Sequence, residues 1–411
     1  MARFWPGMRP LRRRFNPAAQ NQSLPATALA TQFGQSEGKP VTLPNAVRTQ
    51  ALIAHLAAAG YPRCEPPLLQ PASVFLDLSG EDLRGRLYLT QDASGTELCL
   101  RPEFTIPVCR DWLASKRTDQ PAGFSYLGPV FRARPDAPGE FVQAGLESFG
   151  RADHAAADAE ILSVALESAA AAGCAPLAIK LGDADLFAAM IAALDVPAVW
   201  QRRILRGHAR GLSLAAVLDA VPPADSADHS GVLAALQGAD QPGARALVQD
   251  LLNIAGIATV GGRTAGEIAD RYLEQAALRG GGGFPLQKRQ LLERFLAISG
   301  DPDQALHQLR ALATEAGLDL GRPLDEFDAR IGFMFAHGLD VSTVGFATAF
   351  ARNLDYYTGF VFEARVGGKP ASKPVIGGGR YDRLLASLNG GHAVPAVGAA
   401  IWMDRLLEHA A

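Results

Sequence analysis

A segment with two polar side chains on one face is the first feature of the chain that could bind a ligand. Residues 141–147 read FVQAGLE. With the two-residue period of a strand, Gln143, Gly145 and Glu147 share one face, opposite the apolar residues. Gln143 and Glu147 would stand about 13 Å apart, with a glycine leaving open space between them. A solvated sheet face is the alternative, but a mid-strand glycine costs stability unless something occupies the space above it. The pattern therefore predicts a cradle with a polar group at each end.

A carboxylate and a hydroxyl lie close together in a second segment, residues 100–105, which reads LRPEFT. A predicted strand gives way to a helix at this point, so Glu103 and Thr105 would stand at a strand end. A carboxylate and a hydroxyl there are suited to holding a ligand ammonium. The residues fit equally well with a helix cap carrying a surface salt bridge, and the segment alone leaves both interpretations open.

Two further segments near the end of the chain contain charged, aromatic and glycine residues. Residues 352–363 read RNLDYYTGFVFE, and residues 377–382 read GGGRYD. The glycine run is weak evidence by itself, because turns and bulges use glycine freely. The first of the two segments is too particular to arise from composition alone.

The elements that must position these side chains follow from hydrophobic periodicity. A helix should begin near Pro44 and end at Gly60, and an alanine-rich helix should span 155–172. Asp183 is placed to cap a helix that follows a strand. Strands are predicted at 86–90 and 97–101, joined by a turn at 92–95, and at 124–134, 141–149 and 177–181.

The second half of the chain is predicted to be mainly helical before strands return. Helical patterns fill residues 196–339, with a break at four glycines, 280–283. These glycines lack the lysine and the strand-to-helix setting of a phosphate-binding loop, so they indicate a linker. Strands are expected at 342–350, 358–366 and 374–377, and an apolar helix at 397–410. The fold class is therefore α+β: an antiparallel sheet flanked by helices, divided into 41–195 and 340–411 by a helical insertion, 196–339.

Composition excludes several classes of protein. Hydrophobic residues make up 48% of the 411-residue chain and charged residues 20%, as in ordinary folded proteins. No apolar run approaches the roughly 20 residues that would span a bilayer. A net charge of −3 gives no field that would recruit nucleic acid broadly, although a local basic groove stays possible. The four cysteines lack zinc-ligand spacing, so we expect no metal, no cofactor and no disulfide, and a cytoplasmic location.

The first forty residues differ from the rest. Five arginines lie among proline and polar residues, with no acidic residue before Glu37. A mitochondrial transit peptide has a similar composition. Because Pro6, Pro10 and Pro17 interrupt any amphipathic helix, a disordered basic leader over residues 1–40 is the favoured interpretation. An over-long start, with Met8 as another candidate, fits the same interpretation.

The order of these motifs gives a specific resemblance. From about Leu43 to Leu407 the chain resembles the catalytic core of class II histidyl-tRNA synthetases. The shared elements are LRPE-x-T, GPVFR, Q-x-G-x-E, R-x-LDYYTG-x-VFE, GGGRYD and a closing G-x-A-x(4)-R. LDYYTG and GGRYD are the family's two histidine-specific signatures.

The resemblance implies a histidine pocket. Glu103, Thr105 and Gln143 would hold the α-ammonium group, and Arg352 would pair with the α-carboxylate. Glu147 and Tyr357 would each meet one imidazole nitrogen, and Tyr381 would close the pocket. An acid and a phenol can read imidazole from opposite sides, because the neutral ring presents one donor and one acceptor. Asn353 stands where the family usually has glycine. It would alter the end of the pocket that meets the α-carboxylate, and either a tuned affinity or a loss of histidine binding fits that change.

The chain departs from the synthetases in the nucleotide half of the site. Arg132 remains, but the acidic residue that would meet adenine is absent, and the following loop is short and acidic. Trp402 replaces the glycine expected beneath adenine, and an indole there should occlude a base by volume. Trp402 turned into the core is the alternative. Arg405 is retained. Apart from Asn353, the residues named here and in the preceding paragraph therefore form a histidine site of seven residues and a vestigial nucleotide site of three, with none assigned to catalysis.

We also expect no anticodon-binding domain. Together with these departures, that expectation matches the regulatory subunits of ATP phosphoribosyltransferase, a family whose members resemble the core of a synthetase. The resemblance implies a non-catalytic subunit that activates a short-form catalytic subunit and mediates feedback inhibition by histidine. It would form homodimers within a hetero-octamer and bind neither tRNA nor membrane. A truncated enzyme that forms histidyl-adenylate is the main alternative, and a histidine sensor with another partner, such as a kinase, is a third.

Overall fold

The computed structural model describes residues 46–78, 81–115, 118, 120–135, 137–219, 250, 284–352, 356–367 and 373–409. The expected leader, Pro44, the glycines at 280–283 and Asn353 lie outside these residues. Val41–Ala411 forms one compact unit. The subdivision of that unit at 195 and 339 remains a prediction.

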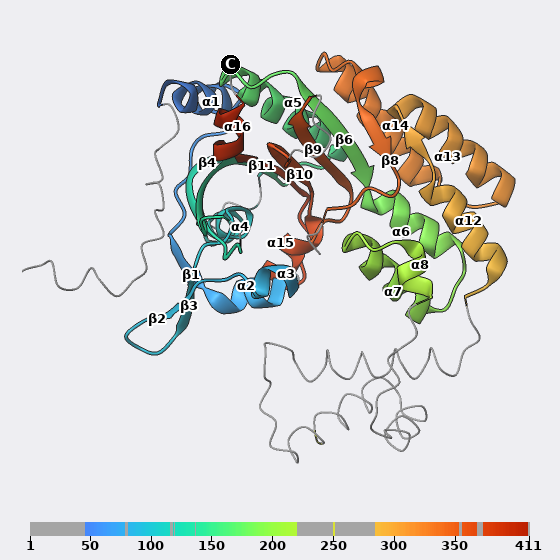
Figure 1. Ribbon diagram of the computed structural model, residues 1–411, viewed down its shortest axis with the longest axis horizontal. Helices are drawn as coiled ribbons and strands as arrows, with labels where there is room; N and C mark the ends of the chain where they lie inside the picture. Colours follow the sequence, from blue (N-terminus) through green and yellow to red (C-terminus); the bar gives the residue numbers. More distant parts are fainter. Residues whose placement is uncertain are drawn as a thin grey trace, which may run out of the picture. The chain divides into compact units, whose positions relative to one another are not determined.

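An eight-stranded sheet forms the centre of this unit, in the order β4-β5-β11-β10-β9-β6-β8-β7 (Figure 1). All neighbouring pairs are antiparallel except β6 and β8, which confirms the antiparallel prediction. The strands are β4 (Ala122–Phe131), β5 (Glu140–Phe149), β6 (Leu177–Asp183), β7 (Ser299–Gly300), β8 (Gly345–Ala347), β9 (Phe360–Val366), β10 (Ile376–Arg380) and β11 (Ala396–Trp402). A separate small sheet has the order β1-β3-β2, with β1 Leu69–Pro71, β2 Leu89–Gln91 and β3 Glu97–Leu100.

Helix α5 (His154–Ala171) covers one face of the large sheet, where it packs on β5, β9, β10 and β11. Helices α1 (Ala46–Ala58) and α14 (Gly321–Ala336) pack against α5 (Figure 1). The apolar residues of β5 between Gln143 and Glu147 point into this layer and belong to the main core. Burial of both sheet and helix surfaces supplies the main stabilisation of the unit.

The opposite face of the sheet carries a second hydrophobic cluster and the site described below. Helices α4 (Thr105–Ala114) and α15 (Asp382–Leu388) contribute to it. Trp112 of α4 stacks on Phe149 of β5, with ring centroids 4.8 Å apart. Two short helices, α2 (Ala72–Leu78) and α3 (Glu81–Arg84), lie before the small sheet's hairpin. Because both faces of β5 are covered, nearly all its residues are buried.

The described part of residues 196–339 is mainly helical. It contains α7, α8, α12, α13 and α14, preceded by α6 (Ala184–Ala193). Asp183 caps α6 by accepting from the backbone N–H groups of Asp185 and Leu186, which confirms its predicted role. The remaining bounds are α7 (Ala198–Ala209), α8 (Leu214–Leu218), α12 (Leu286–Leu296), α13 (Pro302–Ala316) and the 3-10 helix η1 (Val341–Thr343).

The expected apolar helix at 397–410 is wrong for its first half. Residues 396–402 form β11, a central strand that pairs with β5 and β10, and only Met403–Glu408 is helical (α16). A strand buried on both faces reads as a continuous apolar run, and periodicity cannot distinguish such a run from a buried helix. The glycine run at 377–379 is likewise part of strand β10 and not a turn.

Among the residues that the structure describes, no helix is long and apolar enough to cross a membrane. The four cysteines are free thiols, and three of them are buried.

Candidate functional site

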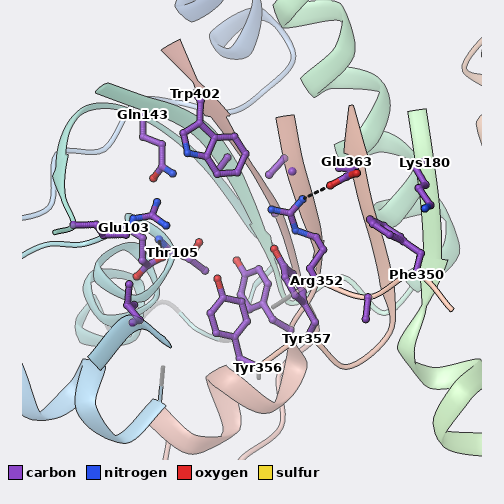
Figure 2. A pocket seen from close by; sticks show the side chains of 18 of the residues that line it. Glu103, Thr105, Gln143, Lys180, Phe350, Arg352, Tyr356, Tyr357, Glu363 and Trp402 are labelled. Carbon is purple, nitrogen blue, oxygen red and sulfur yellow. Dashed lines mark hydrogen bonds and ion pairs between the residues drawn. The ribbon is translucent and has the colours of Figure 1, made fainter. Parts of the chain in front are cut away.

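A cavity of about 560 Å³ opens on the face of the sheet that α4 and α15 flank. Strands β5, β9, β10 and β11 form its floor, and the loop before β9 forms one wall (Figure 2). It brings together eight of the ten predicted site residues: Glu103, Thr105, Arg132, Gln143, Arg352, Tyr357, Tyr381 and Trp402. Glu147 and Arg405 are not among its lining residues.

Glu103 and Thr105 stand together at one side of the cavity, at the start of α4 (Figure 2). The Glu103 carboxylate accepts from the backbone N–H of Thr105 at 2.6 Å and of Ile106 at 2.9 Å, so it caps the helix. Burial raises the pKa of Glu103, while these backbone hydrogen bonds lower it. The cap, one of the two alternatives that the sequence left open, is therefore present in a side chain that also lines the cavity.

Glu147 is not a lining residue, but its carboxylate lies on the cavity face of the sheet, over Gly398. Its Oε1 accepts from the Thr105 hydroxyl at 2.8 Å, and its Oε2 accepts from the Tyr381 hydroxyl. Gly398 is the register partner of Glu147 on β11, and a methyl group on Gly398 would fall 1.6 Å from Glu147 Oε2. Burial raises the pKa of Glu147 from 4.5 to about 8, against the lowering effect of these two hydrogen bonds. The carboxylate thus links two lining side chains and occupies the space that a side chain at position 398 would take.

The space between Gln143 and Glu147 is filled, which corrects the expectation of an open cradle above Gly145. A Cβ atom at Gly145 would lie 2.3 Å from the Tyr126 hydroxyl. Tyr126 is the register partner of Gly145 on β4 and stacks on Phe104, with centroids 4.4 Å apart. The glycine is therefore required by an aromatic side chain of the neighbouring strand.

Gln143 is a buried side chain with an unmet hydrogen-bonding requirement. It is 2% exposed, lines the cavity, and its Oε1 has no hydrogen-bond partner. An unpaired buried acceptor costs about 1–3 kcal/mol. A donor entering the cavity, such as an ammonium group, would relieve that cost.

Arg352 lies across the cavity from Glu103 and Thr105 (Figure 2). Its Nη1 donates to the backbone oxygen of Phe362 at 3.1 Å and is 4.0 Å from the Glu363 carboxylate. The guanidinium covers Gly377, where a Cβ atom would fall 2.0 Å from Nη1. Its Nε is buried without a partner. The glycine of β10 therefore lets a cation lie on the cavity floor with capacity to bind an anion.

Three tyrosines form the wall below Arg352. The rings of Tyr356 and Tyr357 are 5.0 Å apart, and Tyr356 meets Tyr381 edge to face at 5.9 Å. A Cβ atom at Gly379 would lie 2.9 Å from the Tyr357 ring, so this glycine also makes room for a site residue. Figure 2 shows the hydroxyls of Tyr356 and Tyr357 directed into the cavity. The wall thus offers phenol groups between the anionic and cationic sides.

Trp402 ends β11 beside Gln143, its register partner on β5. The indole lines the cavity and is 8% exposed. The guanidinium carbon of Arg405 is 4.6 Å from the Trp402 ring centroid, and that of Arg352 is 5.9 Å away. Arg405 donates to the backbone oxygen of Pro374 at 2.6 Å and does not line the cavity. The indole is therefore held between two arginines, with part of its surface toward the cavity.

Arg132 is the cation that lines the cavity beside Gln143. Its guanidinium carbon is 5.0 Å from the Phe141 ring centroid, and its Nε is buried without a partner. Burial lowers the pKa of Arg132 to about 10. In the loop that follows, Arg134 donates to the backbone oxygen of Pro138, so the loop folds back on itself. Asp136 of this loop lies outside the described residues.

The residues in or against the cavity to which the sequence analysis gave no role include Tyr126, Tyr356, Glu363 and Gly398. The doubled tyrosine of LDYYTG could have indicated Tyr356, and the glycine of the closing motif could have indicated Gly398. Nothing in the chain near Tyr126 signals that its ring fills the space over Gly145, because that contact depends on strand register.

Sequence comparison gives consistent results over most of the chain. The family model described as histidyl-tRNA synthetase matches residues 44–260 and 243–406. The chain is 44% identical over 346 residues to an ATP phosphoribosyltransferase regulatory subunit of Brucella ovis, covering 83% of this chain and 91% of the relative. The protein of the same description from Brucella abortus (strain 2308) matches to the same extent.

Solved structures with the same fold are more distant in sequence. A protein of Bacillus halodurans described as an ATP phosphoribosyltransferase regulatory subunit/histidyl-tRNA synthetase superposes with a TM-score of 0.59 at 20% identity, covering 89% of this chain and 78% of that one. Histidyl-tRNA synthetase from Nostoc sp. PCC 7120 gives 0.61 at 17% identity, covering 92% and 74%. These likenesses confirm the predicted class II synthetase-like fold.

Proposed function

The chain belongs to the family of ATP phosphoribosyltransferase regulatory subunits, and on that premise we propose that histidine binds in the cavity and regulates a short-form catalytic subunit. Membership of the family gives the chain a non-catalytic role in histidine biosynthesis. In the proposal, assembly activates the transfer of phosphoribosyl to ATP, the first step of that pathway, and bound histidine inhibits it.

The observation that carries the histidine proposal is the opposition of charge across the cavity. Glu103, Thr105 and the unpaired oxygen of Gln143 offer acceptors to an ammonium group. Arg352, on the other side, offers its buried Nε and the rest of the guanidinium to a carboxylate. An α-amino acid carries these two groups on one carbon. Charge-assisted hydrogen bonds of this kind contribute about 1.5–3 kcal/mol each.

The side chain of the ligand would be read by Tyr357 and Glu147. Tyr357 directs its hydroxyl into the cavity, and the Glu147 carboxylate occupies the space that a side chain on Gly398 would take. A carboxylate has about four lone-pair sites, so Glu147 can hold Thr105 and Tyr381 and still accept from a ring N–H. In this arrangement Tyr381 closes the pocket through its bond to Glu147.

The nucleotide half is proposed to be vestigial. Trp402 is the register partner of Gln143 at the end of β11, and the guanidinium carbon of Arg405 is 4.6 Å from its ring centroid. A base that entered there would have to displace an indole held by two guanidinium groups. Arg132 remains, with its Nε unpaired and the opposite charge of Glu103 near it, and it is insufficient by itself to position a triphosphate. Histidine can therefore be held, whereas its activation to an adenylate is disfavoured.

The proposed assembly follows the family resemblance. The chain would form homodimers within a hetero-octamer with the short catalytic subunit, act in the cytoplasm and bind no tRNA.

Titration of histidine by calorimetry tests the binding site. The wild-type chain should bind L-histidine, and Arg352→Met should weaken binding roughly 10- to 150-fold, the equivalent of one charge-assisted contact. Tyr357→Phe removes only the hydroxyl and should cost about tenfold. Arg310→Gln, which breaks an exposed ion pair with Asp328, is the matched control. Absence of histidine binding by the wild-type chain, or equal affinity in Arg352→Met, would refute the proposal.

A further inference from the structure

Four buried charged side chains form a connected chain on the α5 side of the sheet, outside the cavity. Arg330 of α14 binds Asp158 of α5 at 3.0 Å and Asp183 at the end of β6 at 2.7 Å. Asp158 also binds Arg380, at the end of β10, at 2.6 Å. The four side chains are between 0% and 6% exposed. Charges this deep persist only when they are paired and hydrogen-bonded, so the arrangement is held closely.

Arg380 at one end of this chain holds the backbone that carries two site tyrosines. Its carbonyl oxygen accepts from the N–H of Thr358, the residue after Tyr357, at 2.8 Å. Its guanidinium binds Asp382, whose carboxylate accepts from the N–H of Ala396 at 2.7 Å. The residue between these two is Tyr381. Arg380 therefore fixes the positions of Tyr357 and Tyr381 from behind the sheet.

Arg330 reaches the same region by a second route. Its guanidinium carbon is 4.9 Å from the ring centroid of Phe360, three residues after Tyr357. Asp183, which Arg330 binds, is the register partner of Phe360 between β6 and β9. A displacement of Arg330 would thus shift Phe360, the first residue of β9 after Tyr357, as well as Arg380.

We propose that Arg330 and Asp158 are positioning residues for histidine: they set the placement of Tyr357 and Tyr381. This inference rests on the proposed function, because it assumes that Tyr357 meets the imidazole ring and that Tyr381 closes the pocket. Glu103 and Thr105 lie at the start of α4 and Gln143 lies on β5, whereas Arg352 precedes Tyr357 by five residues in the same segment. A shift of Arg352 would affect two ligands with the same amino-acid backbone alike, so the ratio of their affinities isolates recognition of the imidazole ring.

The test compares two ligands on one full-length chain. L-Histidine presents two ring nitrogens, whereas L-4-thiazolylalanine has sulfur in place of the ring N–H and keeps the same backbone. The preference for histidine, taken as the ratio of the two dissociation constants from calorimetry, reports placement of the ring contacts. Loss of folded protein lowers both affinities together and leaves the ratio unchanged.

Arg330→Gln is the test variant, and it should reduce the preference about 2- to 30-fold, the range found for mutations along connected networks. Arg330→Lys keeps the charge and should restore part of the preference. It carries the test if Arg330→Gln yields no folded protein. Arg310→Gln, which breaks an exposed ion pair to the same helix, should match the wild type.

An unchanged preference in Arg330→Gln, or in Arg330→Lys where that variant carries the test, would overturn the inference while the proposed function stands. A wild-type chain that binds neither ligand would overturn both.

Discussion

Substitution of Gln143 by leucine should make the free protein more stable and the histidine site weaker. Gln143 is 2% exposed, and its unpaired Oε1 costs the folded state about 1–3 kcal/mol. Leucine has nearly the same volume and removes that cost, so the free energy of unfolding should rise by up to this amount. The same change deletes an acceptor for the ligand ammonium, a contact of about 1.5–3 kcal/mol, so histidine should bind roughly 10- to 150-fold more weakly.

Thermal denaturation and calorimetric titration measure the two effects on the same sample. Gln70→Leu is the matched control, because Gln70 is 3% exposed but fully engaged: its Nε2 donates to the backbone oxygen of Pro67 at 2.8 Å, and its Oε1 accepts from Arg110. That variant should lose stability and keep its affinity for histidine. A Gln143→Leu protein that is destabilised as much as Gln70→Leu, or that binds histidine as the wild type does, would refute the reasoning.

Three further perturbations test separate parts of the site. Gly377→Ala places a methyl group 2.0 Å from Arg352 Nη1, so the guanidinium must shift. Calorimetric titration should therefore give a clearly lower affinity for histidine. Gly332→Ala, which adds a methyl group in open space, is the control and should leave the affinity unchanged. Glu147→Gln should flatten the dependence of thermal stability on pH. Burial raises the pKa of Glu147 from 4.5 to about 8, so the folded state keeps a proton that the unfolded state releases, and the wild type should lose stability as pH rises between those values; equal pH profiles would contradict this. Trp402→Gly should allow an adenine nucleotide to bind in fluorescence or calorimetric titrations, where the wild type binds none; equal behaviour would remove Trp402 as the obstruction.

The residue types of the site could be predicted from the sequence more completely than their arrangement in space. Gln143 and Glu147 were assigned to one face of a strand from period alone, and the structure confirms the shared face. The period does not tell what fills the space between them, because Tyr126 reaches Gly145 only through the register of β4 on β5. The alternation of residues along a strand predicts which side chains share a face of the sheet. Contacts between neighbouring strands depend on the register in which the strands pair, and the alternation does not give that register.

The strand at 396–402 shows a different limit. Its small and apolar residues face α5 on one side and the cavity on the other, so no polar alternation marks it as a strand. The error had a consequence for the site, since Trp402 belongs to the end of this strand and stands beside Gln143. The motif match singled out a residue that lines the cavity, whereas the secondary-structure prediction placed it in a helix and not at the end of a strand.

The bonds of Glu147 could not be predicted from any local feature. Thr105 and Tyr381 are 42 and 234 residues away from it along the chain, and both donate to its carboxylate. The resemblance identified all three as site residues. Only the fold brings them together and shows that the Glu147 carboxylate takes the space beside the backbone of Gly398.

Formation of phosphoribosyl-ATP by a mixture of this chain with a short-form catalytic subunit tests the central claim most directly. The account predicts that the wild-type chain stimulates the catalytic subunit and that L-histidine suppresses the stimulated rate. Arg352→Met should stimulate as well as the wild type but require roughly 10- to 150-fold more histidine for suppression. No stimulation by the wild-type chain, or equal suppression of the wild type and Arg352→Met by histidine, would contradict the account.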